Sequence, residues 1–592
     1  MKSESHRRPR SWVRFSVVLC QLLFGRSKMS STNIPETDSL IENRDRESCG
    51  VADGDANPSD RRHEVLANVF DQLSASTDGM RESARMAGVE RSGVDWILIK
   101  LMEPVDAASS IVFRIGFGLI AAWWCFDDLR TGQIRELYVL PRLHFTYYLF
   151  DFIRPWPGDA MIWHFVGLLI LSLFVAAGLF YRITTTLFAI GFTYLFLLDQ
   201  TNYQNHYYLL TLLSWVMMLL PLNRCASLDA RFGLVSRSDT VPKWSVWFLR
   251  FHIALPYFFG GIAKLHVDWF AGEPMRTHLT SMDWLPGLKP LLTSEVSLEI
   301  FTWGGLLFDL AIVPLLLWRR TRIVAYALCV GFHLTNACLF NIHIFPWFMI
   351  VATTIFLDPS WLRSILRSCR PALLGSAAAS QKAIPRSQRL AGGLVLSYCL
   401  AQLLIPLRAF CYEGNSAWTE RGHHFAWRMM MRTKASALRY YVTDPKTGKT
   451  GSVDLRRFVT PGQLASFSRD PEMILHLAQI IRNEFYQVTS RDVEVRALVL
   501  TTLNGRKPEL LIDPTVDLAK EPRGYYFRSW ILPQREPLRE VAWSVPMLEW
   551  ERHVDIPPLN FLERGKSKVP ARNLSSREST GPQIRPLIEA EH

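Results

Sequence analysis

Long stretches almost without charge recur through the middle of this chain. Between Ser110 and Leu357 the sequence repeatedly runs for about 16 to 20 apolar residues before the next charged residue. Runs of this length match the hydrocarbon thickness of a bilayer, and a lipid-exposed backbone must satisfy its hydrogen bonds internally, so each run should be a helix. The pattern excludes a soluble globular protein and predicts a polytopic membrane protein.

The predicted fold class is mainly α. It comprises a helical membrane domain with about nine spans, followed by a small β-rich or α+β extramembrane domain. The spans are expected at residues 109–127, 161–180, 182–199, 206–221, 244–264, 299–318, 321–339, 343–357 and 389–410.

Basic residues are distributed unevenly over the predicted loops. The loops after the second, fourth, sixth and eighth spans carry roughly twice as many Lys and Arg residues as the loops on the opposite face. The positive-inside rule places these loops and the N-terminus in the cytoplasm, so about nine spans would leave the C-terminal domain on the non-cytoplasmic face. The net charge of +12 is therefore a topology signal and predicts no nucleic-acid partner.

The sequence outside the spans differs in character. Residues 1–108 are polar and should be disordered, and residues 546–592 should form a charged, flexible tail. Within the first region, residues 12–24 have the outline of a signal peptide but lack a cleavage site and are too short to span a membrane. Translation from Met29 explains this run equally simply, and we favour that interpretation.

Residues 411–545 have the composition of a soluble domain, which follows the membrane domain at residues 109–410. Residues 438–453 and 493–512 each predict a β-hairpin, the second with the strong turn signal Asn504-Gly505. Residues 461–486 have helical periodicity. The nine cysteines show no metal-binding spacing, and we predict no metal site.

Polar residues inside or beside the spans are the informative ones, because each is costly in a membrane. Asp309 is expected in a buried ion pair or a helix cap, and His252 and His333 in bridges between helices. Lys264 is more suggestive, since the topology places it on the same outer side as Asn205 and His206.

Lys264 follows two glycines, Gly260 and Gly261, which allow a neighbouring backbone or a flat ligand to approach closely. An amine in apolar surroundings loses affinity for its proton and can serve as a base near neutral pH. A base beside an amide and an imidazole suits a lipid-soluble ligand that must be deprotonated.

Several of these stretches resemble the vitamin K-dependent gamma-glutamyl carboxylases, of the microbial type whose membrane part is also called the HTTM domain. They follow the family's order over about residues 109–535. The matching residues are Leu198-Asp199, Asn205–Leu209, Tyr257-Phe258, Lys264-Leu265, Asp268-Trp269, Gly304–Leu307, Asp309-Leu310, Gln402, Pro406, Gly414, Trp418-Thr419, Ile512–Pro514 and Val516-Asp517.

The resemblance implies an integral membrane enzyme that converts peptidyl glutamate to gamma-carboxyglutamate. Carbon dioxide is added while vitamin K hydroquinone is oxidised by O₂ to its epoxide. Lys264 would deprotonate the hydroquinone, with His206 supporting it. The vitamin K alkoxide formed with O₂ would then remove the gamma-proton of glutamate.

The remaining expected site residues follow from the same resemblance and from position. Asn205, Tyr203, Gly260 and Gly261 would contact the quinone. Tyr398, Gln402 and Pro406, from a stretch at about residues 398–409, would bind the glutamate-containing peptide, and membrane lipid would surround the active-site domain.

The chain departs from the animal enzymes at some positions. They have two adjacent lysines where this chain has Ala263-Lys264, and this chain has no cysteine after Cys411 to match their disulfide. Two alternatives stay open: a homologue that retains only the vitamin K or quinone epoxidase activity, and a non-catalytic membrane module that binds quinone or lipid.

Overall fold

The computed structural model describes residues 93–280, 287–340, 342–365, 385–524, 528–539, 541–563 and 588–589. The signal-like run at residues 12–24 and the alternative start at Met29 lie outside them. The chain divides into two compact units, one of residues 1–103 and 379–392, the other of residues 104–378 and 393–592.

The described part of the first unit is helical. Helix α3 (Gly93–Met102) and the first turns of α17 (Arg386–Leu407) contact each other through the Arg389–Asp95 ion pair at 2.9 Å. We expected residues 93–102 within the disordered N-terminal region. They form a helix because Trp96, Ile97 and their neighbours make this stretch apolar, unlike the rest of that region.

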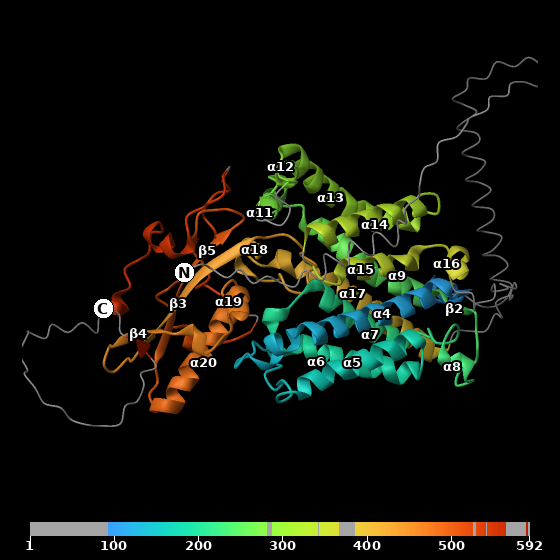
Figure 1. Cartoon of the computed structure of the whole chain (residues 1–592), viewed down its shortest axis with the longest axis horizontal. Helices are drawn as coiled ribbons and strands as arrows, with labels where there is room; N and C mark the ends of the chain where they lie inside the picture. Colours follow the sequence, from blue (N-terminus) through green and yellow to red (C-terminus); the bar gives the residue numbers. More distant parts are fainter. Residues whose placement is uncertain are drawn as a thin grey trace, which may run out of the picture. The chain divides into compact units, whose positions relative to one another are not determined.

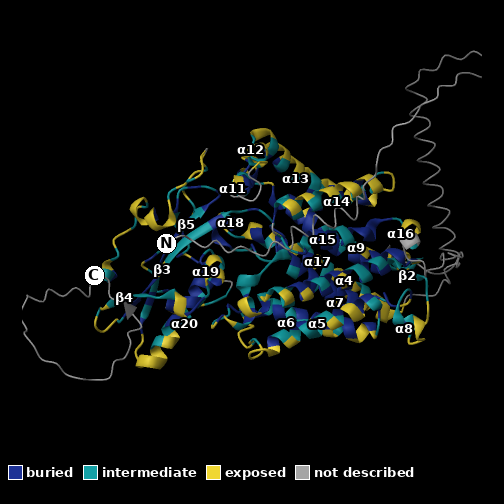
Figure 2. Ribbon diagram, viewed as in Figure 1, coloured by how far each residue is buried: buried dark blue, intermediate teal, exposed yellow. Residues whose placement is uncertain are grey.

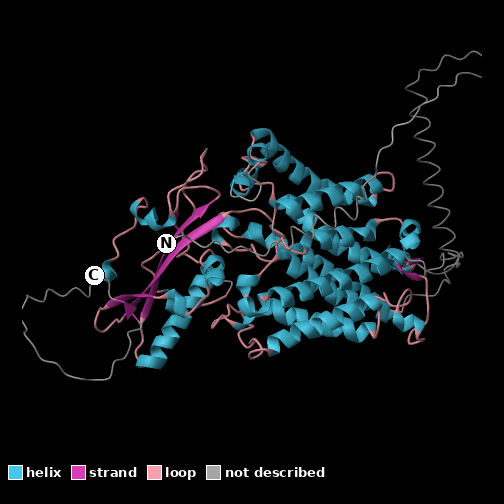
Figure 3. Cartoon of the chain, in the orientation of Figure 1, coloured by secondary structure: helices cyan, strands magenta, loops and turns pink. Residues whose placement is uncertain are grey.

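The described residues contain a helix at each of the predicted spans, and helices dominate the fold (Figure 3). Their bounds are α4 (Ala108–Thr131), α5 (Ala160–Ala177), α6 (Tyr181–Leu198), α7 (Asn205–Leu219), α9 (Lys243–Ala263), α13 (Glu295–Leu317), α14 (Arg322–Leu339), α15 (Phe345–Ala352) and α17. Helices α4, α5, α6 and α7 pack side by side in chain order (Figure 1).

Seven of these helices are long and apolar enough to cross a membrane. The two shorter ones are α7, with 15 residues, and α15, which continues as a 3-10 helix only to Phe356. The predicted number of about nine spans thus exceeds the number of full-length spans in the described residues by two, because apolar composition alone does not show where a helix ends.

Short elements connect the long helices of the second unit. They are β1 (Pro104–Asp106), α8 (Leu228–Arg231), β2 (Thr240–Pro242), α10 (Val267–Phe270), α11 (Met275–Thr280), α12 (Lys289–Leu292), α16 (Pro359–Ile365) and α18 (Ser416–Thr419). Strands β1 and β2 pair antiparallel. Helix α10 matters for the site, because it begins three residues after Lys264.

An antiparallel sheet forms the centre of the C-terminal domain. Its strands are β3 (Lys434–Thr443), β4 (Thr450–Val453), β5 (Glu494–Leu503), β6 (Glu509–Leu510) and β7 (Ile588–Glu589), in the order β6-β5-β3-β4-β7. Both predicted hairpins are confirmed, since β3 pairs with β4 and β5 with β6. The long β3–β5 pair, from Lys434↔Leu503 to Thr443↔Glu494, joins the two hairpins.

Two helices cover one face of this sheet (Figure 1). Tyr440 and Val442 alternate along β3 toward buried residues of α20 (Pro471–Thr489). We predicted one helix over residues 461–486, but the structure has two helices there. The first, α19 (Pro461–Phe467), ends before α20 begins. Pro471 starts α20, and the Asp470 side chain caps the backbone N–H groups of Glu472 and Met473.

The other face of the sheet is covered by residues that we expected in the flexible tail. Trp550, in a 3-10 helix (Met547–Arg552), and Phe561, in α21 (Asn560–Glu563), are buried against Tyr441, Leu498 and Leu500. Figure 2 shows buried residues concentrated along these strands and between the membrane helices. Residues 547–563 are ordered because the outward-facing side chains of β3 and β5 are themselves large and apolar.

Buried polar contacts join the C-terminal domain to the membrane part of the same unit. Arg506 donates to both carboxylate oxygens of Asp268 at 2.7 Å, and Asn504 adds a bond of 2.8 Å. On another side, Gln463 donates to Asp199 at 2.8 Å. These contacts link α10 and the end of α6 to the C-terminal domain.

Candidate active site

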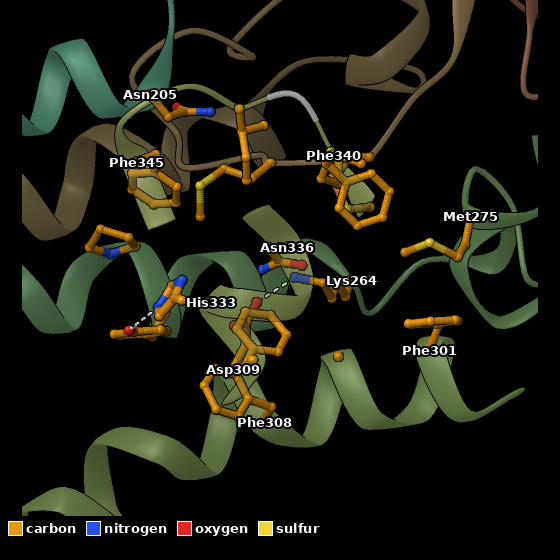
Figure 4. Close-up of a pocket in the computed structure, with 18 of the residues that line it drawn as sticks. Asn205, Lys264, Met275, Phe301, Phe308, Asp309, His333, Asn336, Phe340 and Phe345 are labelled. Carbon is orange, nitrogen blue, oxygen red and sulfur yellow. Dashed lines mark hydrogen bonds and ion pairs between the residues drawn. The ribbon is translucent and has the colours of Figure 1, made fainter. Parts of the chain in front are cut away.

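A cavity of about 570 Å³ lies between the membrane helices and the segment that leads into the C-terminal domain. Its volume falls in the range of about 300 to 1,000 Å³ typical of small-molecule sites. Most of its wall is apolar, and a few polar side chains point into it (Figure 4). The polar and charged lining residues are Gln204, Asn205, His206, Lys264, His278, Asp309, Thr335, Asn336, His333, His423, Arg428 and Arg432.

Lys264 and Asp309 form a buried ion pair at the cavity wall (Figure 4). Only 6% of Lys264 and 4% of Asp309 is exposed. The lysine amine also donates to the carbonyl oxygen of Gly260 at 3.4 Å and lies 5.1 Å from the centre of the Trp269 ring. The ion pair predicted for Asp309 is confirmed, and its partner is the lysine that the sequence identified as a base.

The two glycines before Lys264 bring α9 and α13 together. A Cβ atom on Gly261 would lie 2.5 Å from a methyl carbon of Leu310, and one on Gly260 would lie 3.1 Å from an Asp309 carboxylate oxygen. Neither glycine lines the cavity. The structure shows the close approach of a neighbouring helix that we expected these glycines to allow, and this approach places Asp309 beside Lys264. Their contact with the quinone stays a prediction.

Asn205 and His206 begin α7 and line the same cavity as Lys264. The His206 ring stacks on Phe345 with centroids 5.7 Å apart, and its buried Nε2 atom has no hydrogen-bond partner among the described residues. Lys264 is held by Asp309, and no hydrogen bond joins it to His206 in the described structure. His206 and Lys264 thus line one cavity without a hydrogen bond between them, and the support that we expected His206 to give the lysine stays a prediction.

Tyr203 stands behind the cavity wall. Its hydroxyl group donates to the Asn205 side-chain oxygen at 3.0 Å and accepts from the Phe425 backbone N–H at 2.7 Å. The residue does not line the cavity. Tyr203 thus contacts both Asn205 and the start of the segment 423–432, and the quinone contact that we expected for it stays a prediction.

The residues expected to bind the peptide also lie outside this cavity. Tyr398 shares a hydrogen bond of 2.9 Å with His252, and Gln402 accepts one of 3.2 Å from the Tyr208 hydroxyl group. Pro406 is buried in the last turn of α17. In this structure Tyr398 and Gln402 connect membrane helices, and their role in peptide binding stays a prediction.

The two other intramembrane histidines bridge helices, as expected. His252 joins α9 to α17 through Tyr398, and His333 joins α14 to α9 through the hydroxyl group of Tyr257 at 2.7 Å. His333 also lines the cavity, together with Asn336 one turn later.

Segment 423–432 is the part of the site that sequence reasoning missed. It contributes His423, Arg428, Arg432 and three consecutive methionines to the cavity wall. Phe425, Trp427 and Met430 adopt left-handed backbone conformations, with φ values of 62°, 56° and 56°. The segment has neither helical nor strand periodicity, so its only sequence signal was a pair of arginines, Arg428 and Arg432, on either side of three methionines.

Burial shapes the protonation of this outer segment. It holds the pKa of His423 well below its usual range, with Arg428 and Lys434 nearby acting in the same direction. It also lowers the pKa of Arg428. Arg432 and Lys434 both form ion pairs with Glu420, the second at 3.1 Å.

No cluster of three or more His, Cys, Asp or Glu side chains suited to a metal ion occurs in the described residues. The cavity wall offers a paired amine and carboxylate, amide and imidazole groups, and two arginines, in largely apolar surroundings.

Comparison with known families agrees with this arrangement. Residues 102–361 match the HTTM domain, and residues 387–537 match the lumenal domain of vitamin K-dependent gamma-carboxylase. No solved structure matches the chain. The two matches contain, respectively, the helices that hold the Lys264–Asp309 pair and the segment 423–432. The chain is an integral membrane protein that belongs to the vitamin K-dependent gamma-carboxylase family.

Proposed function

We propose that this protein is a vitamin K-dependent gamma-glutamyl carboxylase. It would convert peptidyl glutamate to gamma-carboxyglutamate with CO₂, using the oxidation of vitamin K hydroquinone by O₂ to the epoxide as the driving reaction. The observation that supports this proposal most directly is the buried Lys264–Asp309 pair, which lies in an apolar cavity shared with Asn205 and His206.

The cavity suits a reduced naphthoquinone. Its apolar wall includes Phe301 and Phe345 and the Phe308–Phe332 pair, whose ring centroids are 3.9 Å apart. Such walls favour a flat aromatic ligand, while Asn205 and His206 offer hydrogen bonds to its oxygen atoms. The buried, unpartnered Nε2 atom of His206 would gain a partner when the hydroquinone binds.

The proton acceptor for the hydroquinone would be the Lys264–Asp309 pair. When the shared proton resides on the lysine, the carboxylate can accept another; when it resides on the carboxyl group, the amine can. The hydroquinone and O₂ together supply a base strong enough to remove a gamma-proton from glutamate, and CO₂ then combines with the resulting carbanion. The apolar walls would keep water away from this base.

The peptide would reach the cavity from the C-terminal domain. The segment 423–432 both lines the cavity and leads into β3 of that domain. Together with the distribution of basic residues, this supports an active site and a C-terminal domain on the non-cytoplasmic face of the membrane.

The test uses membranes that contain the full chain. They would receive vitamin K hydroquinone, labelled bicarbonate and a glutamate-rich peptide, and both label incorporation and epoxide formation would be measured. Lys264→Ala should abolish both signals. Lys446→Ala, in the exposed β3–β4 turn, is the matched control and should leave them unchanged.

The outcomes separate the candidate activities. Epoxide formation without labelled peptide would support a quinone epoxidase instead of a carboxylase. Absence of both products in wild-type membranes that bind the hydroquinone would indicate a non-catalytic module. Equal activity in wild type and Lys264→Ala would refute the role given to the lysine.

A further inference from the structure

Arg428 is a buried cation that pairs with none of the residues that the structure describes. Only 9% of the residue is exposed, and it lines the cavity that contains Lys264 and Asp309. Its Nε atom is buried without a hydrogen-bond acceptor, and its guanidinium group forms no hydrogen bond or ion pair with any described residue.

Lys264, Asp309 and Arg432, which also line the cavity, each have an ion-pair partner among the described residues, although Glu420 pairs with Lys434 as well as with Arg432. Lys264 is paired with Asp309, and Arg432 with Glu420. The histidines nearest to Arg428 do not balance it either: burial lowers the pKa of both His266 and His423, and each would at most add positive charge. Arg428 is therefore a cation at the cavity wall that pairs with no described carboxylate.

An unpaired buried charge carries a large desolvation cost, which a bound ligand of opposite charge can offset. A guanidinium group presents its N–H donors as a planar fork that matches the two oxygens of a carboxylate. The peptide substrate of the proposed reaction has such a group at the end of each glutamate side chain. The other cosubstrates, CO₂, O₂ and a hydroquinone, are uncharged when bound.

We propose that Arg428 binds the side-chain carboxylate of the peptide substrate and so selects glutamate as the residue to be modified. This inference rests on the proposed function and extends it by naming the group that recognises the acidic side chain. The carboxylate would lie in the same cavity as the hydroquinone, which brings the neighbouring C–H bond within reach of the base formed there.

The same contact assists the chemistry. When the C–H bond next to the carboxylate breaks, the proton passes to the base formed from the hydroquinone and O₂, and the electron pair stays on carbon before forming the bond to CO₂. The side chain then briefly bears a second negative charge. Arg428, buried and already oriented, would stabilise that charge.

The experiment compares wild type with Arg428→Gln and Arg428→Lys, and uses Arg456→Gln as control because Arg456 is an exposed arginine paired with Asp454 on the C-terminal domain. Three quantities are measured: kcat and KM for a glutamate peptide, KM for bicarbonate, and peptide-independent epoxide formation. Binding of fluorescent peptides that contain either glutamate or glutamine is measured separately, without hydroquinone.

Arg428→Gln should lower kcat/KM for the glutamate peptide by roughly 10- to 150-fold, the range for losing a hydrogen-bonded contact to a charged group. Arg428→Lys retains the charge but lacks the planar fork of N–H donors, so its kcat/KM for the glutamate peptide should lie between those of Arg428→Gln and wild type. The KM for bicarbonate and the rate of peptide-independent epoxide formation should change much less than kcat/KM for the peptide. Wild type should bind the glutamate peptide more tightly than the glutamine peptide, and Arg428→Gln should bind both equally.

An unchanged kcat/KM for the peptide, or an increase confined to the KM for bicarbonate, would overturn the proposal. Undiminished preference for the glutamate peptide in Arg428→Gln would do the same. The binding measurement keeps this inference separate from the proposed function: if wild type forms neither product, the proposed activity fails, while loss of glutamate preference in the variants still identifies Arg428 as the carboxylate-binding residue.

Discussion

The Lys264–Asp309 pair allows a quantitative test of the site. Both side chains are nearly inaccessible to solvent, so removing one partner leaves the other as an uncompensated charge in the membrane part of the protein. Breaking a buried pair in this way typically costs about 3–5 kcal/mol. Asp309→Leu and Lys264→Met should each lower the free energy of unfolding by this amount.

The double variant should behave differently. Replacing both partners by apolar residues of similar size removes both charges, and such replacements are often nearly neutral. Lys264→Met/Asp309→Leu should therefore be much more stable than the sum of the single variants predicts, with a coupling energy of about 3 kcal/mol or more. Of these four proteins, only wild type should form the epoxide, because the proton acceptor is incomplete in the three variants.

The assay is equilibrium unfolding of the purified protein in detergent micelles, followed by tryptophan fluorescence. Asp159→Asn serves as control, because Asp159 pairs with Arg135 at 2.9 Å with more than 60% of both side chains exposed. Exposed pairs of this kind contribute about 0–1 kcal/mol. If Asp309→Leu costs no more than Asp159→Asn, or if the two site substitutions are additive, the reasoning about a buried, coupled pair is wrong.

Three further predictions follow from other contacts. Burial alone would raise the pKa of Asp268, but hydrogen bonds from Arg506 and Asn504 outweigh this effect and lower it below the unfolded value of about 3.9. The Asp268–Arg506 pair therefore stabilises the fold fully above that pH and loses its contribution as the pH falls through the folded pKa of Asp268. Asp268→Asn should remove this part of the acid dependence of unfolding and lower the free energy of unfolding by about 3 kcal/mol at pH 7. Gly261→Ala should reduce epoxide formation more than it reduces substrate affinity, because the added methyl group meets Leu310 and moves α13, with Asp309, away from Lys264. Gly393→Ala is the control and should have no effect on epoxide formation, because nothing lies near the new methyl group. A glycosylation or export reporter fused after residue 563 should respond as on the non-cytoplasmic side, and a cytoplasmic signal there would contradict the predicted topology.

Much of the architecture could be read from local pattern. The apolar runs located every membrane helix, since burial in lipid needs only length and hydrophobicity. The hairpins at residues 438–453 and 493–512 were also predictable, because Asn504-Gly505 and the Asp444 turn specify their connections locally. The break at Asp470-Pro471 had a local signal as well, and the periodicity that continued across it obscured that signal.

Part of the site could be predicted in the same way. Lys264, Asn205 and His206 were conspicuous because polar groups are costly at membrane depth, and the structure brings all three to one cavity. Tyr203, Gly260 and Gly261 were recognised as special positions, but the structure shows them in contact with other residues of the site, and their contact with the quinone stays a prediction. No pattern of hydrophobicity distinguishes a residue that contacts a ligand from one that holds its neighbour in place.

The sequence by itself determined which segments enter the membrane, where the soluble domain begins and which polar residues are costly, because each of these depends on the free energy of transferring a local stretch of chain out of water. Only the tertiary structure decided which charges neutralise each other. Lys264 and Asp309 are 45 positions apart, and Arg428 lies in another domain match altogether. Whether a buried charge is balanced depends on distances across the fold. The pairing of Lys264, and the finding that Arg428 pairs with no described residue, therefore became visible only once the helices and the segment 423–432 were assembled around one cavity.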